Sequence, residues 1–364
     1  MKVLVINPIM YTSETRLIKR ASTIKDSMMY DFCLAFHNLG HDVTLVGGEP
    51  FKPTNEEQYP FKVLWWNCYF KKIFLPHCLP FMPMTYKYIR KNRDNFDLII
   101  SSEVFSINSL LAYKAAPNKI IIWHELAKHN LMMHKIPSKI WYGIIAKSLM
   151  KNAKVVARSQ EAKEFISKYC VNTDDTIIDH GVNLDKFQMC KDKENSFVVC
   201  SQLIERKRID GIIRKFANYL KKYNHHSILY IIGEGNLKDN LILLVKELKI
   251  ESNVIFTGKM NHQELMPILS KSKALLVNTI KDNNMVSIVE SISVATPILS
   301  TNIPLNSTYI NKYKLGIAKK EWNENDLNEI VVNNEFYVRN CITYREGLST
   351  TERVKQFINI KNNM

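Results

Sequence analysis

The sequence predicts an α/β protein with two doubly wound parallel sheets that face a central cleft. First, apolar runs of strand length alternate with stretches whose apolar residues recur at helical spacing. Second, this alternation restarts in the second half of the chain. Third, 364 residues exceed what one hydrophobic core usually serves. We therefore expect domains at residues 1–185 and 186–344, followed by a helix at residues 345–364 that crosses back to the first domain.

The first domain opens with a strand, a helix and a second strand. The strand is expected at residues 2–7 and the helix at residues 27–39, which Gly40 ends in the manner of a C-cap. The turn after the first strand lacks glycine, which argues against a dinucleotide-binding G-x-G-x-x-G loop there. Further strands are expected at residues 41–46, 97–101, 119–123 and 155–159.

The chain is strongly basic, with a formal net charge of +15. Nucleic acid, an anionic membrane face and anionic small substrates all suit such a charge. Because no nucleic-acid-binding motif is present, we expect no nucleic acid partner and favour an anionic membrane surface. Residues 61–94 interleave aromatic residues with lysines, which suits a bilayer interface or an amphiphilic substrate. An edge strand followed by a core helix with a basic outer side would give the same pattern.

The cysteines and the apolar runs indicate the cellular compartment in which the protein is expected. The seven cysteines show no C-x-x-C pairs and no metal-ligand spacing, which is typical of reduced thiols in the cytoplasm. The opening strand is too short for the core of a signal peptide, and no later apolar run would span a bilayer. We expect a cytoplasmic protein that is peripheral at the inner face of the plasma membrane.

The second domain is organised around a strand, a polar turn and a short helix at residues 274–297. The helix would begin at the carboxyl edge of a parallel sheet, where its N-terminus suits an anionic ligand such as a diphosphate. Glu290 follows Ser287 by three residues. It either closes a capping box with Ser287 or accepts hydrogen bonds from ligand hydroxyls such as those of a ribose. Other strands are expected at residues 196–200, 228–232, 254–256 and 298–301.

Three segments of this domain together resemble the carboxyl half of the retaining glycosyltransferases of family 4. They are residues 231–237, 253–258 and 282–297, which occur in the family's order and spacing. The resemblance implies the GT-B fold, in which two Rossmann-like domains face a cleft. In the first domain it rests on the order of the strands and on His124.

The resemblance assigns the polar turn and its helix to a nucleotide-sugar donor. Glu290 matches the glutamate that binds the ribose of the donor. Asp282 stands where the family has a glutamate near the hydroxyls of the donor sugar. The backbone N–H groups of Asn284, Met285 and Val286 would approach the sugar and the diphosphate.

Basic residues complete the implied donor site. Lys207 matches a lysine that neutralises the leaving diphosphate. Gln202 stands where the family has an arginine that assists this lysine, so Arg206 or Arg208 would have to reach the same phosphates. Because Lys207 and the helix N-terminus supply positive charge to the leaving group, we expect neither a metal nor another cofactor.

Two further residues belong to the implied site. Gly233 lies in a Gly-Glu-Gly turn at the same edge of the sheet and is assigned to donor binding. His124 matches a histidine near the reacting carbon and the acceptor. The resemblance thus assigns catalytic roles to His124, Lys207 and Asp282.

The leading hypothesis is a retaining glycosyltransferase that moves a sugar from a UDP-sugar to a growing, lipid-linked glycan in capsule or other cell-surface polysaccharide synthesis. Two alternatives stay open. One is a catalytically inactive GT-B subunit that binds a nucleotide-sugar or a partner. The replacement of the family's arginine by Gln202 favours this alternative. The other is a nucleotide-sugar epimerase of the same fold.

Overall fold

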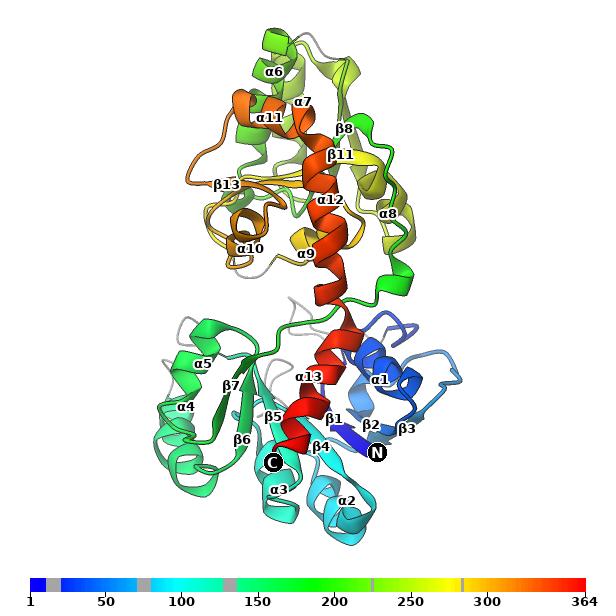
Figure 1. Ribbon diagram of the computed structural model, residues 1–364, viewed down its shortest axis with the longest axis vertical. Helices are drawn as coiled ribbons and strands as arrows, with labels where there is room; N and C mark the ends of the chain where they lie inside the picture. The colour runs from blue at the N-terminus through cyan, green and yellow to red at the C-terminus, as the bar shows by residue number, and fades with distance from the viewer. Residues whose placement is uncertain (11–20, 71–79, 127–135, 224–225, 283–284) are drawn as a thin grey trace. The chain divides into compact units, whose positions relative to one another are not determined.

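The structure is a computed structural model that describes residues 1–10, 21–70, 80–126, 136–223, 226–282 and 285–364. Its internal contacts divide the chain into two compact units (Figure 1). The first unit comprises Met1–Gly181 together with Thr350–Met364, and the second unit comprises Val182–Ser349. The sequence placed the corresponding junctions after residues 185 and 344.

The first unit contains a seven-stranded sheet in the order β3-β2-β1-β4-β5-β6-β7, in which every neighbouring pair is parallel. The strands are β1 (Lys2–Ile6), β2 (Asp42–Gly48), β3 (Lys62–Trp66), β4 (Leu98–Ser102), β5 (Ile120–His124), β6 (Lys154–Ala157) and β7 (Thr173–Ile177). The helices are α1 (Met28–Asn38), α2 (Met84–Asn92), α3 (Ile107–Ala115), α4 (Ile136–Ile140), the π-helix η4 (Trp141–Leu149), α5 (Gln160–Ile166) and α13 (Thr350–Asn362).

Helices cover both faces of this sheet, so its central strands are apolar on both sides. In β1, Val3 and Val5 join the core on one face, while Leu4 and Ile6 join the core on the other. A strand buried on both faces reads as a continuous apolar run, which is why its position could be predicted. The C-terminal helix α13 packs against α1, and the ring of Phe357 lies 5.3 Å from those of Phe32 and Trp123.

The second unit repeats the arrangement with a six-stranded parallel sheet in the order β10-β9-β8-β11-β12-β13. The strands are β8 (Glu194–Cys200), β9 (Ile228–Ile232), β10 (Val254–Gly258), β11 (Ser272–Val277), β12 (Ile298–Thr301) and β13 (Gly316–Lys319). The helices are α6 (Ile209–Tyr223), α7 (Lys238–Glu247), α8 (His262–Lys271), α9 (Val286–Ser293), α10 (Ser307–Lys312), α11 (Glu324–Val332) and α12 (Asn334–Arg345). The two sheets confirm the predicted fold class.

The segment of interleaved aromatic residues and lysines divides between an edge strand and a helix. Strand β3 lies at the edge of the first sheet, and its Trp66 is buried and packs edge-on against Tyr88 of α2. Tyr69 and Phe70 are exposed. Residues 71–79 lie outside the described part of the chain. No helix among the described residues combines the length and hydrophobicity needed to cross a bilayer.

Candidate functional site

Five of the nine site residues predicted in the second half line a pocket at the carboxyl edge of the second sheet. The pocket has a volume of about 460 Å³. Its lining includes five of the predicted residues, namely Lys207, Asp282, Met285, Val286 and Glu290. The remaining lining residues are Cys200, Ser201, Met260, His262, Leu265 and Ser287. Asn284 lies outside the residues that the structure describes.

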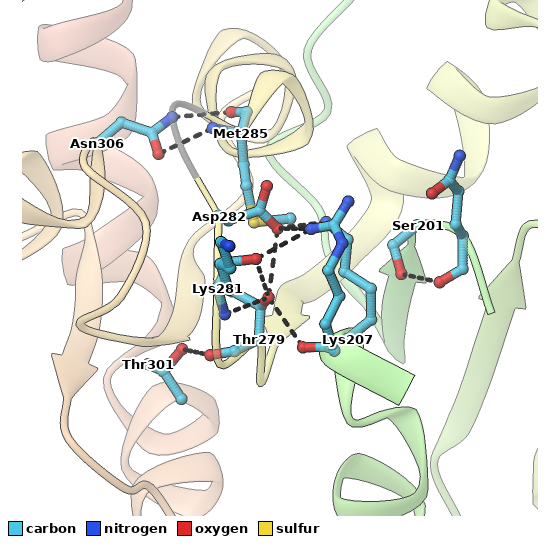
Figure 2. A network of polar contacts seen from close by, with 10 residues as sticks. Ser201, Lys207, Thr279, Lys281, Asp282, Met285, Thr301 and Asn306 are labelled. Atoms are coloured by element: carbon cyan, nitrogen blue, oxygen red, sulfur yellow. Dashed lines mark hydrogen bonds and ion pairs between the residues drawn. The ribbon is translucent and has the colours of Figure 1, made fainter. Parts of the chain in front are cut away.

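Asp282 lies between two cations at this pocket. Its Oδ2 atom is 2.5 Å from Nζ of Lys207 and 3.1 Å from Nη1 of Arg206 (Figure 2). The hydroxyl oxygen of Thr279 lies 3.3 Å from this oxygen. The Lys207 side chain is only 10% exposed, so the carboxylate compensates a charge that is largely removed from water. Lys207 and Arg206 are therefore paired with Asp282 in this structure.

Two loops hold this cluster in place. Lys207 and Arg206 belong to the short 3₁₀ helix η6 (Glu205–Lys207), which follows β8. Thr279, after β11, donates its hydroxyl to the carbonyl of Arg206 at 3.1 Å, and the N–H of Ile280 donates to the same carbonyl at 3.0 Å. Thr301, in β12, donates to the carbonyl of Thr279 at 2.9 Å. These bonds fix the spacing between the cations and Asp282 through the backbone.

Gly233 contributes to the site through close packing of the backbone. Its φ of +144° lies in the region that favours glycine, and a Cβ atom there would come within 1.9 Å of the carbonyl oxygen of Ser201. Gly235 is constrained by packing alone, since a Cβ atom would lie 2.3 Å from the carbonyl oxygen of Leu203. Gly233 and Gln202 do not line the pocket. The turn therefore positions the loop that leads from β8 to Lys207.

The capping-box interpretation of Glu290 is wrong. Helix α9 begins at Val286 with Met285 as its N-cap, so Ser287 lies inside the helix and Glu290 is not its N3 residue. The turn before α9 is held instead by Asn306, whose side chain accepts from the N–H of Met285 at 3.2 Å and donates to its carbonyl at 2.8 Å (Figure 2). The Met285 N–H is thus bonded within the protein, and the side chain of Met285 lines the pocket.

Glu290 presents a largely buried carboxylate to the pocket. Its side chain is 18% exposed, and its Oε1 atom lies 3.7 Å from Nε2 of His262. Burial raises the pKa of Glu290 to about 7. The carboxyl group is consequently close to half-ionised at neutral pH, and groups that donate hydrogen bonds to it would favour its charged form.

His124 lies in the first unit, at the carboxyl end of β5. Its ring is fully buried, stacked on Phe165 and edge-on to Tyr142. Its Nδ1 atom lies 2.8 Å from Oε2 of Glu103, which follows β4. The structure therefore places this histidine inside the first unit's core rather than at an exposed surface of it.

A second cluster of charged residues lies at the carboxyl edge of the first sheet. Glu125 is 3.1 Å from Nη1 of Arg158 and 3.7 Å from Nε2 of His180. The contact with His180 and the charge of Arg158 lower the pKa of Glu125 to about 2. The guanidinium of Arg158 is buried over the ring of Trp123, with 3.9 Å between its central carbon and the ring centroid.

Two family models match adjoining parts of the chain. The model described as Glycosyltransferase Family 4 matches residues 27–186, and the model described as Glycosyl transferases group 1 matches residues 183–332. The chain belongs to glycosyltransferase family 4.

The chain is also similar to curated glycosyltransferases and to solved structures. The O-antigen chain mannosyltransferase RfbU of Salmonella typhimurium is 25% identical over 170 residues, which are 46% of this chain and 47% of that protein. The alpha-monoglucosyldiacylglycerol synthase of Streptococcus pneumoniae is 22% identical over 244 residues, which are 60% of this chain and 55% of that protein. The chain thus spans about half the length of the curated relatives that it matches. The structure of Anabaena Alr3699/HepE in complex with UDP covers 100% of both chains with a TM-score of 0.67 and 13% identity, which shows the shared GT-B fold.

The sequence of this glycosyltransferase gave no prediction for the charged cluster of the first unit. Glu103 directly follows β4, Glu125 follows β5 and Arg158 follows β6. Their positions after three neighbouring strands were a usable signal, because the carboxyl ends of parallel strands meet at one edge of a sheet. In the second unit Lys207 and Asp282 also follow strands, β8 and β11, but they were assigned by the resemblance to the family.

Proposed function

We propose that this family 4 glycosyltransferase binds a nucleotide-sugar in the pocket of the second unit and transfers the sugar to a glycan acceptor. One observation carries the proposal: Lys207, Asp282 and Glu290 line a single pocket beside the N-terminus of α9. That set combines a cation for a diphosphate with carboxylates for hydroxyl groups. A helix N-terminus adds partial positive charge at the same place.

The donor is a UDP-sugar, and each side chain has a distinct role. Glu290 accepts hydrogen bonds from the ribose hydroxyls, for which its partly buried carboxylate is suited. Lys207, with Arg206 beside it, neutralises the diphosphate as the bond between sugar and phosphate breaks. Asp282 accepts hydrogen bonds from the donor sugar. Support for uridine comes from Alr3699/HepE, a protein of the same fold whose structure contains UDP.

The reaction retains the configuration at the anomeric carbon and needs no metal. Breaking the bond between sugar and diphosphate builds negative charge on the departing diphosphate. Fixed cations stabilise this charge more strongly in the transition state than in the ground state. Lys207, which lines the pocket, and Arg206, which pairs with the same Asp282 carboxylate, are the cations proposed for this role.

The acceptor is a growing, lipid-linked glycan of a cell-surface polysaccharide such as a capsule, and the enzyme works at the inner face of the plasma membrane. Two similar proteins support this assignment, because one is named for O-antigen chains and the other for a glycosylated diacylglycerol. The net charge of +15 suits an anionic membrane surface.

The direct test is to incubate the purified protein with a panel of nucleotide-sugars, with and without lipid-linked acceptors, and to measure nucleotide release. We expect release with one UDP-sugar, and a loss on the order of 10²–10³ in rate for Lys207→Ala. Conversion of the sugar without an acceptor would instead indicate the epimerase. Absence of nucleotide release with every donor and acceptor would overturn the proposal. In that case, cellular function that survives Lys207→Ala and Glu290→Ala would indicate the inactive subunit.

A further inference from the structure

A helix of the first unit turns apolar side chains outward on the face opposite its core contacts. Helix α4 (Ile136–Ile140) continues directly into the π-helix η4 (Trp141–Leu149). The buried side of this continuous helix is formed by residues four apart, which are Ser138, Tyr142, Ala146 and, just after η4, Met150. Tyr142, Ala146 and Met150 pack into the core on one face of the first sheet.

The opposite side carries an apolar row of four side chains. Ile136 is 71% exposed, Ile140 50%, Ile144 62% and Leu149 47%. A surface helix ordinarily places polar residues on the side away from the core, so the row is unusual. The wider turn of the π-helix, marked by the bond from the N–H of Met150 to the carbonyl of Ile145, keeps Leu149 on the same side as the isoleucines.

The surroundings of the apolar row are basic. Lys139, Lys147 and Lys151 are exposed along the same helix and the turn that follows it. The sequence contains no aspartate or glutamate from residue 126 to residue 160. The charged residues of the helix and of the turn that follows it are therefore all positive. Exposed large apolar side chains flanked by lysines are the pattern of a helix that lies in the plane of a bilayer surface.

We propose that the outer face of α4 and η4 is the surface through which the protein docks on an anionic lipid bilayer. The apolar row enters the boundary between headgroups and acyl chains, and the three lysines contact anionic headgroups while their stems lie along the apolar surface. A second copy of this chain is a poorer occupant, because two such basic faces would repel each other. The inference deepens the proposed location at the membrane and rests on it.

The test measures co-sedimentation of the full chain with vesicles of phosphatidylcholine alone or mixed with phosphatidylglycerol. We expect binding to the mixed vesicles only. The Ile140→Ser, Ile144→Ser double variant should lose about tenfold to hundredfold in partitioning. The Lys139→Glu, Lys147→Glu double variant should lose at least about tenfold, with a weaker dependence on salt. Circular dichroism of each variant checks that it is folded.

A matched control replaces exposed apolar residues elsewhere. Leu243 is 57% exposed and Val332 is 72% exposed, both in the second unit, and Leu243→Ser with Val332→Ser should bind vesicles as the unchanged protein does. Equal losses in control and isoleucine variants would overturn the proposal. So would isoleucine variants that bind normally, or that change only the oligomeric state in gel filtration. A chain that binds vesicles through this face but never releases nucleotide would overturn the proposed function and leave this inference standing.

Discussion

Glu290 links the stability of the second unit to pH. Burial raises the pKa of this carboxyl group from 4.5 to about 7, so the folded state holds its proton more tightly than the unfolded state does. The stability that this protonation provides is complete below pH 4.5 and is lost as the pH rises through about 7. Ionised Glu290 therefore destabilises the folded protein above neutral pH.

Replacing Glu290 by glutamine should remove this dependence. Above pH 7.5 we expect Glu290→Gln to be more stable than the unchanged protein by about 3 kcal/mol, since one pKa unit corresponds to ~1.4 kcal/mol. The difference should vanish toward pH 4.5. Urea unfolding across this pH range measures it. Glu247→Gln, at an exposed position, is the control, and its stability relative to the unchanged protein should not change in this way with pH.

Donor binding should depend on pH through the same group. Ribose hydroxyls donate to the ionised carboxylate, so we expect UDP to bind more tightly as the pH rises from 6 to 8, and Glu290→Gln to bind roughly tenfold more weakly with a smaller pH dependence. Isothermal titration calorimetry at several pH values gives both results. If Glu290→Gln keeps the full pH dependence of the unchanged protein, the dependence comes from another group, such as the terminal phosphate of UDP itself.

Asp282 should oppose binding of free nucleotide and assist transfer. Because its carboxylate pairs with Lys207 and Arg206, Asp282→Asn leaves both cations available to a diphosphate, and we expect UDP to bind on the order of tenfold more tightly. Sugar transfer should fall, since a charged acceptor for the sugar hydroxyls is lost. Comparison of UDP affinity with turnover tests this. Glu234→Gln, which removes an exposed carboxylate paired with Lys238, is the control. Weaker UDP binding in Asp282→Asn would contradict the expectation.

At the scale of elements, the strands with continuous apolar runs could be predicted, whereas the edge strands β7 and β13 could not. β7 has the sequence Thr-Asp-Asp-Thr-Ile and is largely solvated, so no apolar run marks it. The true start of α9 was also hidden, because Asn306, distant in sequence, holds the turn around Met285. The end of α9 could not be predicted from residue type either. Ala295, directly after the C-cap Val294, adopts a φ of +59°, a conformation in which glycine is the usual residue.

The turn after β9 should be sensitive to a single methyl group. Gly233→Ala would place a Cβ atom 1.9 Å from the Ser201 carbonyl oxygen at a φ of +144°. We expect a loss of at least about 2 kcal/mol in the free energy of unfolding. Chemical denaturation measures it. Gly143→Ala, at a helical position with no atom within 4 Å of the added carbon, should be neutral or stabilising by less than about 1 kcal/mol.

At the scale of the whole molecule, length and the repeated alternation were enough to predict two parallel-sheet units. The charged cluster of Glu125 and Arg158 was not predicted, because its partners follow different strands and only the folded sheet brings them together. The aromatic segment at residues 61–94 was ambiguous for a related reason. Trp66 and Phe70 are both large aromatic residues, but Trp66 is buried and Phe70 is exposed, and the residue type does not distinguish the two surroundings.

The final helix should stabilise the first unit selectively. Phe357 is fully buried and contacts Phe32 and Trp123, so Phe357→Ala should cost about 3–5 kcal/mol. Hydrogen exchange followed by mass spectrometry should show lost protection in the strands of the first unit and unchanged protection in β8–β13. Equal loss in both units would contradict the division at Gly181 and Ser349.

Since α13 completes the first unit, that unit is built from two separate stretches of chain. Val354, Phe357 and Ile360 belong to the same core cluster as Val3 and Val5 of β1. A ribosome must therefore make all of the second unit before it can supply the last layer of the first unit's core. During synthesis the second unit can finish folding while the first still exposes the apolar surface that α13 will cover. For this protein the domain made first is the domain completed last.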